Sequence, residues 1–186
     1  MRQSISDFKS KFSGGARPNL FEVKLQWPDN IIRGEGGDAL TDTVMIKAAS
    51  LPASVINTIE VPFRGRKFKV AGDRTFESWT ITVINDTDMS LRNKFELWMD
   101  LISRNSVNIQ DLSTPRDYMR DLMVHQLNNE QEEIKSYQIH DAFPVNISAI
   151  ELNYETNDQI EEFTVEFSYQ FWTSKESGVA DYRGSR

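Results

Sequence analysis

The sequence predicts a mainly β protein, an antiparallel β-sandwich or barrel with one α-helix packed at its side. Three observations predict this class. Apolar residues recur at every second position in several segments, one segment alone repeats them at helical spacing, and glycine or proline marks most connections. Eight or nine strands are expected, and the helix falls between the middle strands in the sequence. This order favours an antiparallel sandwich or barrel in which the helix covers one opening.

The N-terminal segment, residues 1–18, is polar and contains glycine, which predicts an arm outside the folded domain. Phe8 and Phe12 lie four positions apart in this arm, the spacing of a short helical turn that docks elsewhere. The first strand follows, because four apolar residues alternate with polar ones: Phe21, Val23, Leu25 and Trp27. Pro28 ends this strand.

The next part of the chain predicts a loop and then a long hairpin. Residues 29–42 are rich in glycine and aspartate, which is typical of a long loop, and residues 44–50 predict a second strand. Two further strands are expected across residues 55–71, joined by a turn in which Gly65 supplies the conformational freedom. Residues 76–84 then alternate strictly and predict a strand with one buried face.

One helix is predicted after Asp88. Its apolar residues follow at spacings of 4, 3 and 4, and we expect them to be its core-facing stripe: Leu91, Phe95, Trp98 and Ile102. Asp86 and Asp88 offer an N-cap and favourable negative charge at the start of the helix. We expect the helix to end within residues 105–110.

The last third of the chain returns to strands. Residues 121–127 and 133–140 predict a hairpin, because the two asparagines between them tolerate left-handed backbone. A further strand is expected over residues 143–149. The alternation then shifts by one position to Ile150, Leu152 and Tyr154, which predicts a bulge or bend. The alternation is cleanest over residues 163–171, which predict the last strand.

These boundaries divide the chain into three parts. Residues 1–18 form the arm, residues 19–173 the β domain, and residues 174–186 a polar C-terminal tail that is expected to be disordered.

The composition fits one folded domain. The 186 residues include 39% apolar and 26% charged residues, which is typical of a globular protein. Lys and Arg total 21 and Asp and Glu total 28, so the net charge is −7. This charge disfavours a protein that coats DNA, because phosphate contacts need local positive charge.

Cysteine content and hydropathy exclude further classes. The absence of cysteine excludes a disulfide framework, a thiolate nucleophile and cysteine metal ligands. No apolar run is long enough to span a membrane, and residues 1–16 lack the apolar region of a signal peptide. We therefore expect a protein without a membrane anchor that is made in a cytoplasm.

No group of residues predicts an enzyme. His125 and His140 both fall in predicted strands, without the convergent partners that a metal site or a catalytic triad needs. The acidic clusters are typical of helix caps and solvated turns. The glycines of residues 34–37 lack the spacing and the trailing lysine of a phosphate loop. We expect neither a catalytic residue nor a cofactor nor a metal.

Four cations lie within six residues of the predicted hairpin, interleaved with Phe63 and Phe68: Arg64, Arg66, Lys67 and Lys69. Three interpretations are open. The cluster contacts nucleic acid through charge and stacking, its charges prevent unwanted edge pairing, or it docks on an acidic neighbouring subunit. The acidic residues elsewhere in the chain favour the third interpretation.

Two motifs stand out for their length. Residues 16–21 read Ala-Arg-Pro-Asn-Leu-Phe, and residues 70–76 read Val-Ala-Gly-Asp-Arg-Thr-Phe before the strand that starts near Trp79. Both resemble the tail tube protein family of contractile-tailed, myovirus-type bacteriophages. Other features follow in the family's order, and they cover Leu51-Pro52-Ala53, Ala142-Phe143-Pro144-Val145 and Asn157 to Phe163. The resemblance spans roughly residues 16–172.

The resemblance implies a fold and a mechanism. Tube proteins of this family form hexameric rings that stack into a rigid hollow tube, and each subunit adds strands to a β-barrel around the channel. The implied location is the virion, inside the tail sheath, with assembly in the host cytoplasm. The implied partners are further copies of the chain, the sheath protein, the tube initiator of the baseplate and the tail terminator. Phage DNA passes through the lumen without sequence-specific contacts.

The resemblance also gives candidates for contacts between subunits or rings: Phe63, Arg64, Arg66, Lys67, Lys69, Arg17, Asp73 and Arg74. Because the net charge is acidic, carboxylates that face the channel would repel DNA phosphates and let DNA slide. Alternatives stay open within the fold, namely the baseplate initiator or the tube of a secretion or bacteriocin particle. A small-ligand-binding β-barrel is the alternative from another class.

Overall fold

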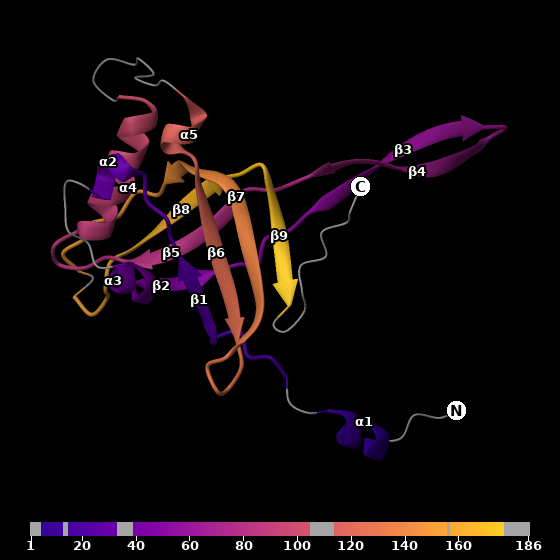
Figure 1. Cartoon of the computed structure of the whole chain (residues 1–186), viewed down its shortest axis with the longest axis horizontal. Coiled ribbons are helices and arrows are strands. Elements are labelled where there is room, and N and C mark those ends of the chain that lie inside the picture. Colours follow the sequence, from indigo (N-terminus) through magenta and orange to yellow (C-terminus); the bar gives the residue numbers. More distant parts are fainter. Residues whose placement is uncertain (1–4, 13–14, 33–38, 105–113, 156, 177–186) are drawn as a thin grey trace.

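The strands form one bent antiparallel sheet, from which a separate two-stranded hairpin projects (Figure 1). The computed structural model describes residues 5–12, 15–32, 39–104, 114–155 and 157–176. Within them lie nine strands: β1 (Phe21–Lys24), β2 (Ile46–Ala49), β3 (Val55–Phe63), β4 (Arg66–Thr75), β5 (Trp79–Ile84), β6 (Arg120–Leu127), β7 (Glu133–Ile147), β8 (Glu162–Ser168) and β9 (Phe171–Glu176). The described helices are α1 (Ile5–Lys11), α2 (Asp29–Ile32), α3 (Ala39–Val44), α4 (Ser90–Ile102) and α5 (Pro115–Tyr118).

The long strand β7 joins the two halves of the sheet. The main strand order is β1-β6-β7-β8-β5-β2, and β9 adds to β7. The first half of β7 pairs with β6 and β9, and its second half pairs with β8. Between the halves, Asp141 has a φ of 54°, a left-handed conformation that aspartate tolerates. The sheet bends there, which fits the sandwich-like form of the predicted class, and the described strands do not close into a barrel.

The helix α4 covers one face of this sheet. Alternate residues of β5 and β8 point toward it and are buried, as the strict period of these strands predicts. Phe95 contacts the rings of Phe163 and Phe167, with centroids 6.2 and 6.0 Å apart. Leu91, Phe95 and Trp98 are buried, and Ile102 is partly buried against the same core. The mainly β class with a helix at its side is therefore confirmed.

Several expected boundaries were wrong. Residues 29–42 do not form a plain loop, because α2 and α3 lie at its two ends. The segments 133–140 and 143–149 form one strand, β7, since the bulge at Asp141 redirects the strand without ending its pairing. Residues 150–154 are not a strand, although they alternate.

The ends of the helix and of the last strand also differ from expectation. The α4 helix ends at Ile102, before residues 105–110, which lie outside the described residues. The strand expected over 163–171 breaks after Ser168, and β9 leaves β8 to pair with β7. Residues 174–176, which were expected to belong to a disordered tail, are part of β9, because their backbone groups form hydrogen bonds with β7. The rest of that tail, residues 177–186, lies outside the described part of the chain.

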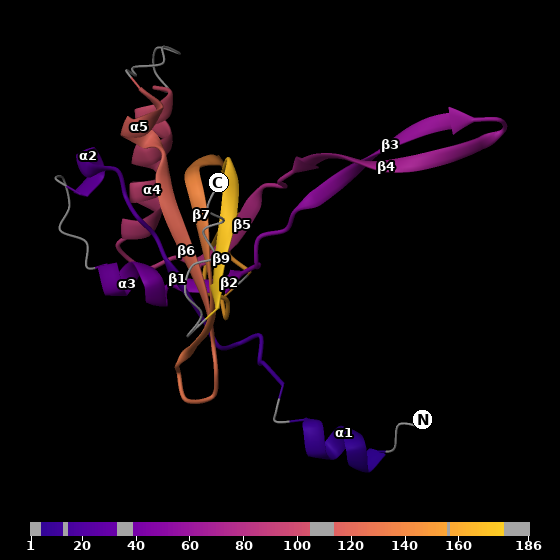
Figure 2. The ribbon, with the colours of Figure 1, turned by 45° about the vertical axis from the view of Figure 1, so that its right-hand side comes forward.

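Two appendages lie away from the body. The β3–β4 hairpin extends far from the sheet, and α1 lies apart from the body on the N-terminal side (Figures 1 and 2). Neither α1 nor β3 contains a buried residue. Of the helices that the structure describes, none is long and apolar enough to cross a membrane.

Candidate assembly interfaces

The β3–β4 hairpin has one apolar face. In its register Ile59 lies opposite Val70, Val61 opposite Phe68, and Phe63 opposite Arg66. Cross-strand partners share a face, so five apolar side chains gather on one side: Ile59, Val61, Phe63, Phe68 and Val70. All five are exposed, and the two phenylalanines keep 68% and 65% of their surface in solvent. An exposed apolar patch of this kind marks an interaction surface.

The opposite face of the hairpin is charged. Glu60 lies opposite Lys69 and accepts a hydrogen bond from Lys67 Nζ at 2.6 Å, while Lys69 Nζ lies 3.7 Å from the same carboxylate. These pairs are solvent-exposed, so each contributes about 1 kcal/mol or less to stability. The hairpin is therefore amphipathic, with a solvated face that keeps it soluble and an apolar face that lacks a cover.

The sequence of the hairpin specifies its turn and its bulge. Arg64 and Gly65 have φ angles of 45° and 80°, the two positive values that a tight hairpin turn of primed type requires. Gly72 lies at the bulge opposite Asn57. A Cβ atom at Gly72 would lie 3.0 Å from the carbonyl oxygen of Asn57, so a side chain there would force the facing backbone to shift by a few tenths of an ångström. Gly72 belongs to the motif at residues 70–76.

The contact candidates fall into three places. Phe63, Arg64, Arg66, Lys67 and Lys69 are together at the tip of the hairpin. Asp73 and Arg74 lie at its base, a full strand length away.

Arg17 lies in the arm before β1, where its carbonyl oxygen accepts a hydrogen bond from Gln126 Nε2 at 2.9 Å. The structure therefore brings the five tip residues together at one end of the hairpin, with Phe63 and Arg66 on its apolar face and Lys67 and Lys69 on its charged face, and leaves the other three elsewhere.

The arm carries a second apolar surface. Phe8 and Phe12 stack with ring centroids 5.2 Å apart, and Ile5 lies one turn before Phe8. All three side chains are largely exposed. A seven-residue helix has little stability in isolation, so it depends on a surface that covers this stripe.

A third apolar surface was missed by the sequence analysis. The connection between β7 and β8, residues 148–161, exposes Leu152, Tyr154 and Ile160. The alternation of Ile150, Leu152 and Tyr154 was the available signal, and it was interpreted as a bulged strand. Alternation alone does not distinguish a strand from an exposed apolar loop when no partner strand is present.

The sheet face away from α4 is open and polar. Its side chains alternate with the core residues of each strand, and the rows include Glu22, Lys24, Thr80, Thr82, Met123, His125, Ser136, Gln138, Thr164, Glu166, Thr173 and Lys175. Two lysines of this face are paired with carboxylates. Lys24 Nζ lies 3.3 Å from Glu22, and Lys47 Nζ lies 2.5 Å from Glu162. Glu22 and Glu162 are therefore balanced by lysines, whereas Glu166 accepts a hydrogen bond from the hydroxyl of Ser78 and Asp121 lies beside His140.

Both histidines belong to the rows of this face and lie beside carboxylates, although His125 itself is buried. His140 Nδ1 lies 3.3 Å from Asp121, and its Nε2 lies 2.9 Å from the hydroxyl of Thr173. His125 Nδ1 lies 3.0 Å from Glu133. Among the described residues no three side chains of ligand type converge on one point, so neither histidine belongs to a candidate metal site there.

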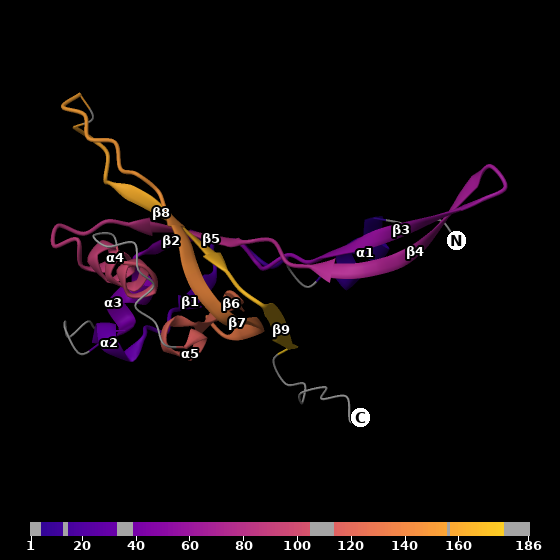
Figure 3. The same cartoon turned by 90° about the horizontal axis from the view of Figure 1, so that it is seen from above.

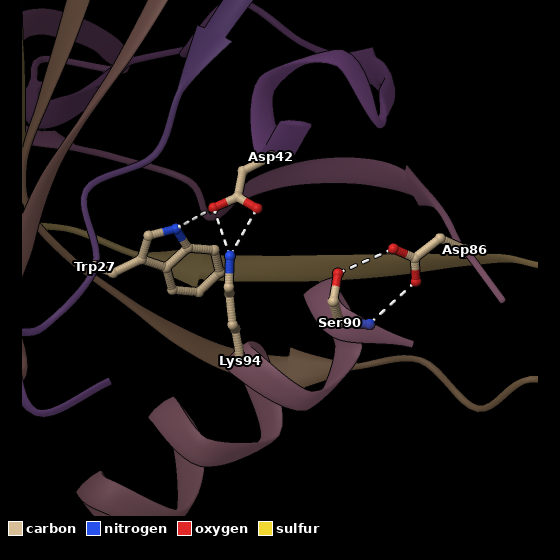
Figure 4. A network of polar contacts seen from close by, with 5 residues as sticks. All are labelled: Trp27, Asp42, Asp86, Ser90 and Lys94. Carbon is tan, nitrogen blue, oxygen red and sulfur yellow. Dashed lines mark hydrogen bonds and ion pairs between the residues drawn. The ribbon is translucent and has the colours of Figure 1, made fainter. Parts of the chain in front are cut away.

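A buried polar network ties the helix α3 to the body (Figure 4). Asp42 of α3 accepts hydrogen bonds from Trp27 Nε1 at 2.8 Å and from Lys94 Nζ at 2.8 and 2.9 Å. At the start of α4, Asp86 accepts from the amide and the hydroxyl of Ser90. Asp86 therefore serves the helix start as expected, although the residue at the N-cap position is Met89.

Comparisons with known proteins agree with this architecture. Residues 16–175 match the family described as phage tail tube protein. The chain is 31% identical to tail tube protein gp19 of Enterobacteria phage T4 over 171 residues, which cover 90% of this chain and 98% of that protein. It is 25% identical to the tail tube protein of Serratia phage KSP90, covering 89% and 94% of the two chains.

Solved structures share the fold at lower identity. A chain of the anti-feeding prophage baseplate superposes with a TM-score of 0.64 at 16% identity, covering 90% of this chain and all of that chain. A chain of an extracellular contractile injection system, the PVC sheath–tube complex in its extended state, superposes with a TM-score of 0.57 at 17% identity, covering 94% and 99%. These likenesses concern the fold alone.

Proposed function

This chain belongs to the phage tail tube protein family, and from that premise we propose that it assembles as stacked hexameric rings into the inner tube of a contractile tail. The tube would be the conduit through which DNA leaves the virion. The role is structural rather than enzymatic. The single observation that carries this proposal is the uncovered apolar face of the β3–β4 hairpin, because a subunit that exposes such a face needs a neighbour.

The hairpin is proposed as the contact between rings. A two-stranded ribbon is marginally stable alone, and this one reaches far beyond the body (Figure 2). Burial of five apolar side chains against another copy would stabilise both the ribbon and the stack. A contact between different surfaces of identical subunits propagates without closing, which is the geometry of a stacked tube. Arg17, Asp73 and Arg74 are retained as secondary contact candidates.

The open polar face is proposed as the lining of the lumen. The opposite face is covered by α4, so the strands have one face free for a channel. Thr80, Thr82, Thr164 and Thr173 offer hydroxyl groups there, and two of its lysines, Lys24 and Lys47, are paired with carboxylates. Unpaired lysines would hold DNA through its phosphates. A lining whose lysines are paired, in a subunit whose net charge is −7, would instead let DNA pass without binding.

The remaining assignments follow from this role. We propose the virion tail, inside the sheath, as the location, with assembly in the host cytoplasm. The proposed partners are further copies of the chain, the sheath protein, the baseplate tube initiator and the tail terminator. We propose an arm over residues 1–18, followed by a β domain that extends past the expected boundary at residue 173, because β9 ends at Glu176; the family match over residues 16–175 supports a single domain of about this extent.

The test removes the apolar face of the hairpin tip. Phe63→Ser combined with Phe68→Ser leaves the body untouched, since neither side chain contributes to the core. We expect wild-type protein to form rings or tubes of uniform width in negative-stain electron microscopy across a concentration series. The double variant should stay unassembled with an unchanged melting temperature.

A matched control is Leu97→Ser, which removes a half-exposed apolar side chain from α4. This variant should assemble like the wild type. Tubes of normal length from the double variant would contradict the hairpin contact, and wild-type protein that never assembles would contradict the tube role.

A further inference from the structure

We propose that the β7–β8 loop, residues 148–161, is the surface of a second copy on which the tip of the β3–β4 hairpin docks. This inference rests on the proposed function, because it names the partner of the hairpin contact. The hairpin tip is defined as residues 61–69, and the described residues of the loop, 148–155 and 157–161, are called the acceptor loop.

The acceptor loop has an apolar, hollowed surface. Leu152 keeps 81% of its surface in solvent, Tyr154 is fully exposed, and Ile160 is largely exposed. Two adjoining hollows of about 410 and 600 Å³ lie along the loop, and both are lined by Glu151 and Gln159. Leu152 and Tyr154 line the smaller hollow. The loop therefore offers space and apolar contact for an aromatic side chain of the kind that the hairpin tip presents.

The acidic charge of the acceptor loop indicates the kind of partner that it binds. Residues 148–162 contain five acidic residues and no lysine or arginine: Glu151, Glu155, Asp158, Glu161 and Glu162. Glu162 is paired with Lys47, and Glu161 accepts a hydrogen bond from Asn85. No lysine or arginine in the described part of the chain pairs with the other three. The loop would therefore attract a partner that is both apolar and basic.

The hairpin tip has the complementary composition. Phe63 and Phe68 lie on its apolar face, and four cations lie within the same nine residues. Lys67 and Lys69 share Glu60, whereas Arg64 and Arg66 form no ion pair with a carboxylate of the described residues. Arg64 lies over the ring of Phe63 at 5.5 Å, so the cation and the aromatic ring are presented together. Tyr154 of the loop can receive such a cation on its own ring.

The two surfaces cannot meet within one chain. The acceptor loop and the hairpin tip lie at opposite ends of the molecule, as both views show (Figures 1 and 3). A contact between them therefore joins two copies head to tail. Such a contact leaves a free tip on one copy and a free loop on the other, so it propagates along an assembly.

The first experiment exchanges the charges. Arg64→Glu with Arg66→Glu reverses the tip, and Glu151→Lys with Glu155→Lys reverses the loop. Each double variant should lower the fraction of protein that sediments as tubes by about tenfold or more, because like charges then face each other. The chain that carries all four changes should assemble again. The matched control, Glu130→Lys with Glu132→Lys, changes two exposed acids of the β6–β7 turn and should assemble normally.

The outcomes separate the two proposals. If the tip variant arrests growth and the loop variant grows normally, the hairpin contact stands and the acceptor loop is wrong. If the fourfold variant remains unassembled, the acceptor loop is also wrong. If the tip variant assembles normally but loses retention on immobilised DNA that the wild type shows, the cations serve nucleic acid and the inference falls. Wild-type protein that forms neither rings nor tubes overturns both proposals.

A second experiment does not depend on long tubes. The chain has no cysteine, so single cysteines can be placed at will. We expect a short bismaleimide to join Lys67→Cys and Gln159→Cys proteins into a heterodimer when the two are mixed. Replacing either protein with Asn129→Cys, on the exposed β6–β7 turn, should abolish that product. Equal yields in all three mixtures would overturn the assignment.

Discussion

At the scale of single residues, the buried pair of Asp42 and Lys94 holds the helix α3 against α4. Both side chains keep only 6% of their surface in solvent, and the carboxylate has Trp27 as its further donor. Removing two charges from water is costly, so the pair persists only because its hydrogen bonds are complete. The pair and Trp27 link α3, α4 and the segment that follows β1 (Figure 4).

Lys94→Met should lower the free energy of unfolding by about 3–5 kcal/mol, because it leaves the Asp42 carboxylate buried without its cation. Urea unfolding at neutral pH measures this loss. The double variant that adds Asp42→Asn should recover part of it, since a neutral amide still accepts from Trp27. A single variant as stable as the wild type would show that water reaches the carboxylate in solution.

Tyr169 gives the chain an alkaline sensitivity. Burial, and secondarily the charge of Glu77, raises the pKa of the Tyr169 phenol above its ordinary value. Folded protein then holds this proton more tightly than unfolded protein, whose tyrosines titrate near pH 10. Stability from this group is therefore complete below about pH 10 and is lost as the pH rises toward the raised pKa.

Tyr169→Phe should flatten this loss, because it removes the phenol. The measurement compares urea midpoints of wild type and variant at about pH 9 and about pH 11. The urea midpoint of the variant relative to that of the wild type should be higher at about pH 11 than at about pH 9. Parallel losses in both would assign the alkaline sensitivity to other groups.

At the scale of elements, α4 is the part that periodicity predicted best. A stripe at helical spacing has one way to be buried, and Leu91, Phe95 and Trp98 lie against the sheet as that spacing requires. Trp98 Nε1 also donates to the carbonyl oxygen of Tyr118 at 2.8 Å, which satisfies its only donor. The helix therefore anchors α5 as well as covering the sheet.

Trp98→Ala should destabilise the monomer by about 3–5 kcal/mol, because it opens a cavity among Trp27, Phe95 and Phe167. Chemical unfolding monitored by circular dichroism measures this. Leu97→Ala, on the exposed side of the same helix, is the control and should change stability by about 0.5 kcal/mol or less. Equal effects of both variants would contradict the packing of α4.

The elements that the sequence mispredicted share a physical cause. The separate strands expected within residues 133–149 form one strand because β7 changes partners at Asp141. Pairing partners are a property of the whole sheet, and local alternation does not carry them. Likewise, α3 is held in place by the contact between Asp42 and Lys94, which are 52 residues apart. Local composition in residues 29–42 could not reveal that contact.

The hairpin shows the same limit for the candidate site. Its strands, its turn at Gly65 and its basic residues were all accessible from local patterns. The projection of the hairpin away from the body could not be predicted, because local patterns do not show whether its strands pair with the strands of the main sheet. The β3 and β4 strands pair only with each other, so their apolar residues remain uncovered.

At the scale of the whole molecule, the core and the exposed apolar surfaces are separated. The body buries its own core, while the hairpin, α1 and the acceptor loop carry large apolar side chains outside it. No residue between 55 and 75 belongs to the core. Folding of the body and assembly of copies therefore depend on different parts of the chain.

Excision of the hairpin tests this separation. Val55 and Thr75 are register partners, so a two-residue Asn-Gly turn can join them in place of residues 56–74. The shortened chain should keep the melting temperature of the wild-type monomer, because it loses no core contact. It should also stay monomeric in sedimentation velocity at concentrations where the wild type forms rings or tubes, because its apolar face is gone.

The two readouts of this variant answer separate questions. A shortened chain that unfolds at a much lower temperature would mean that the hairpin packs on its own body in solution, which would remove the reason for a partner. A shortened chain that is stable but still stacks would assign the contact between rings to α1 or to the acceptor loop acting without the tip. The proposal requires a shortened chain that is stable and does not assemble. That result would show that the apolar residues of β3 and β4 contribute to contacts between copies and not to the stability of the monomer.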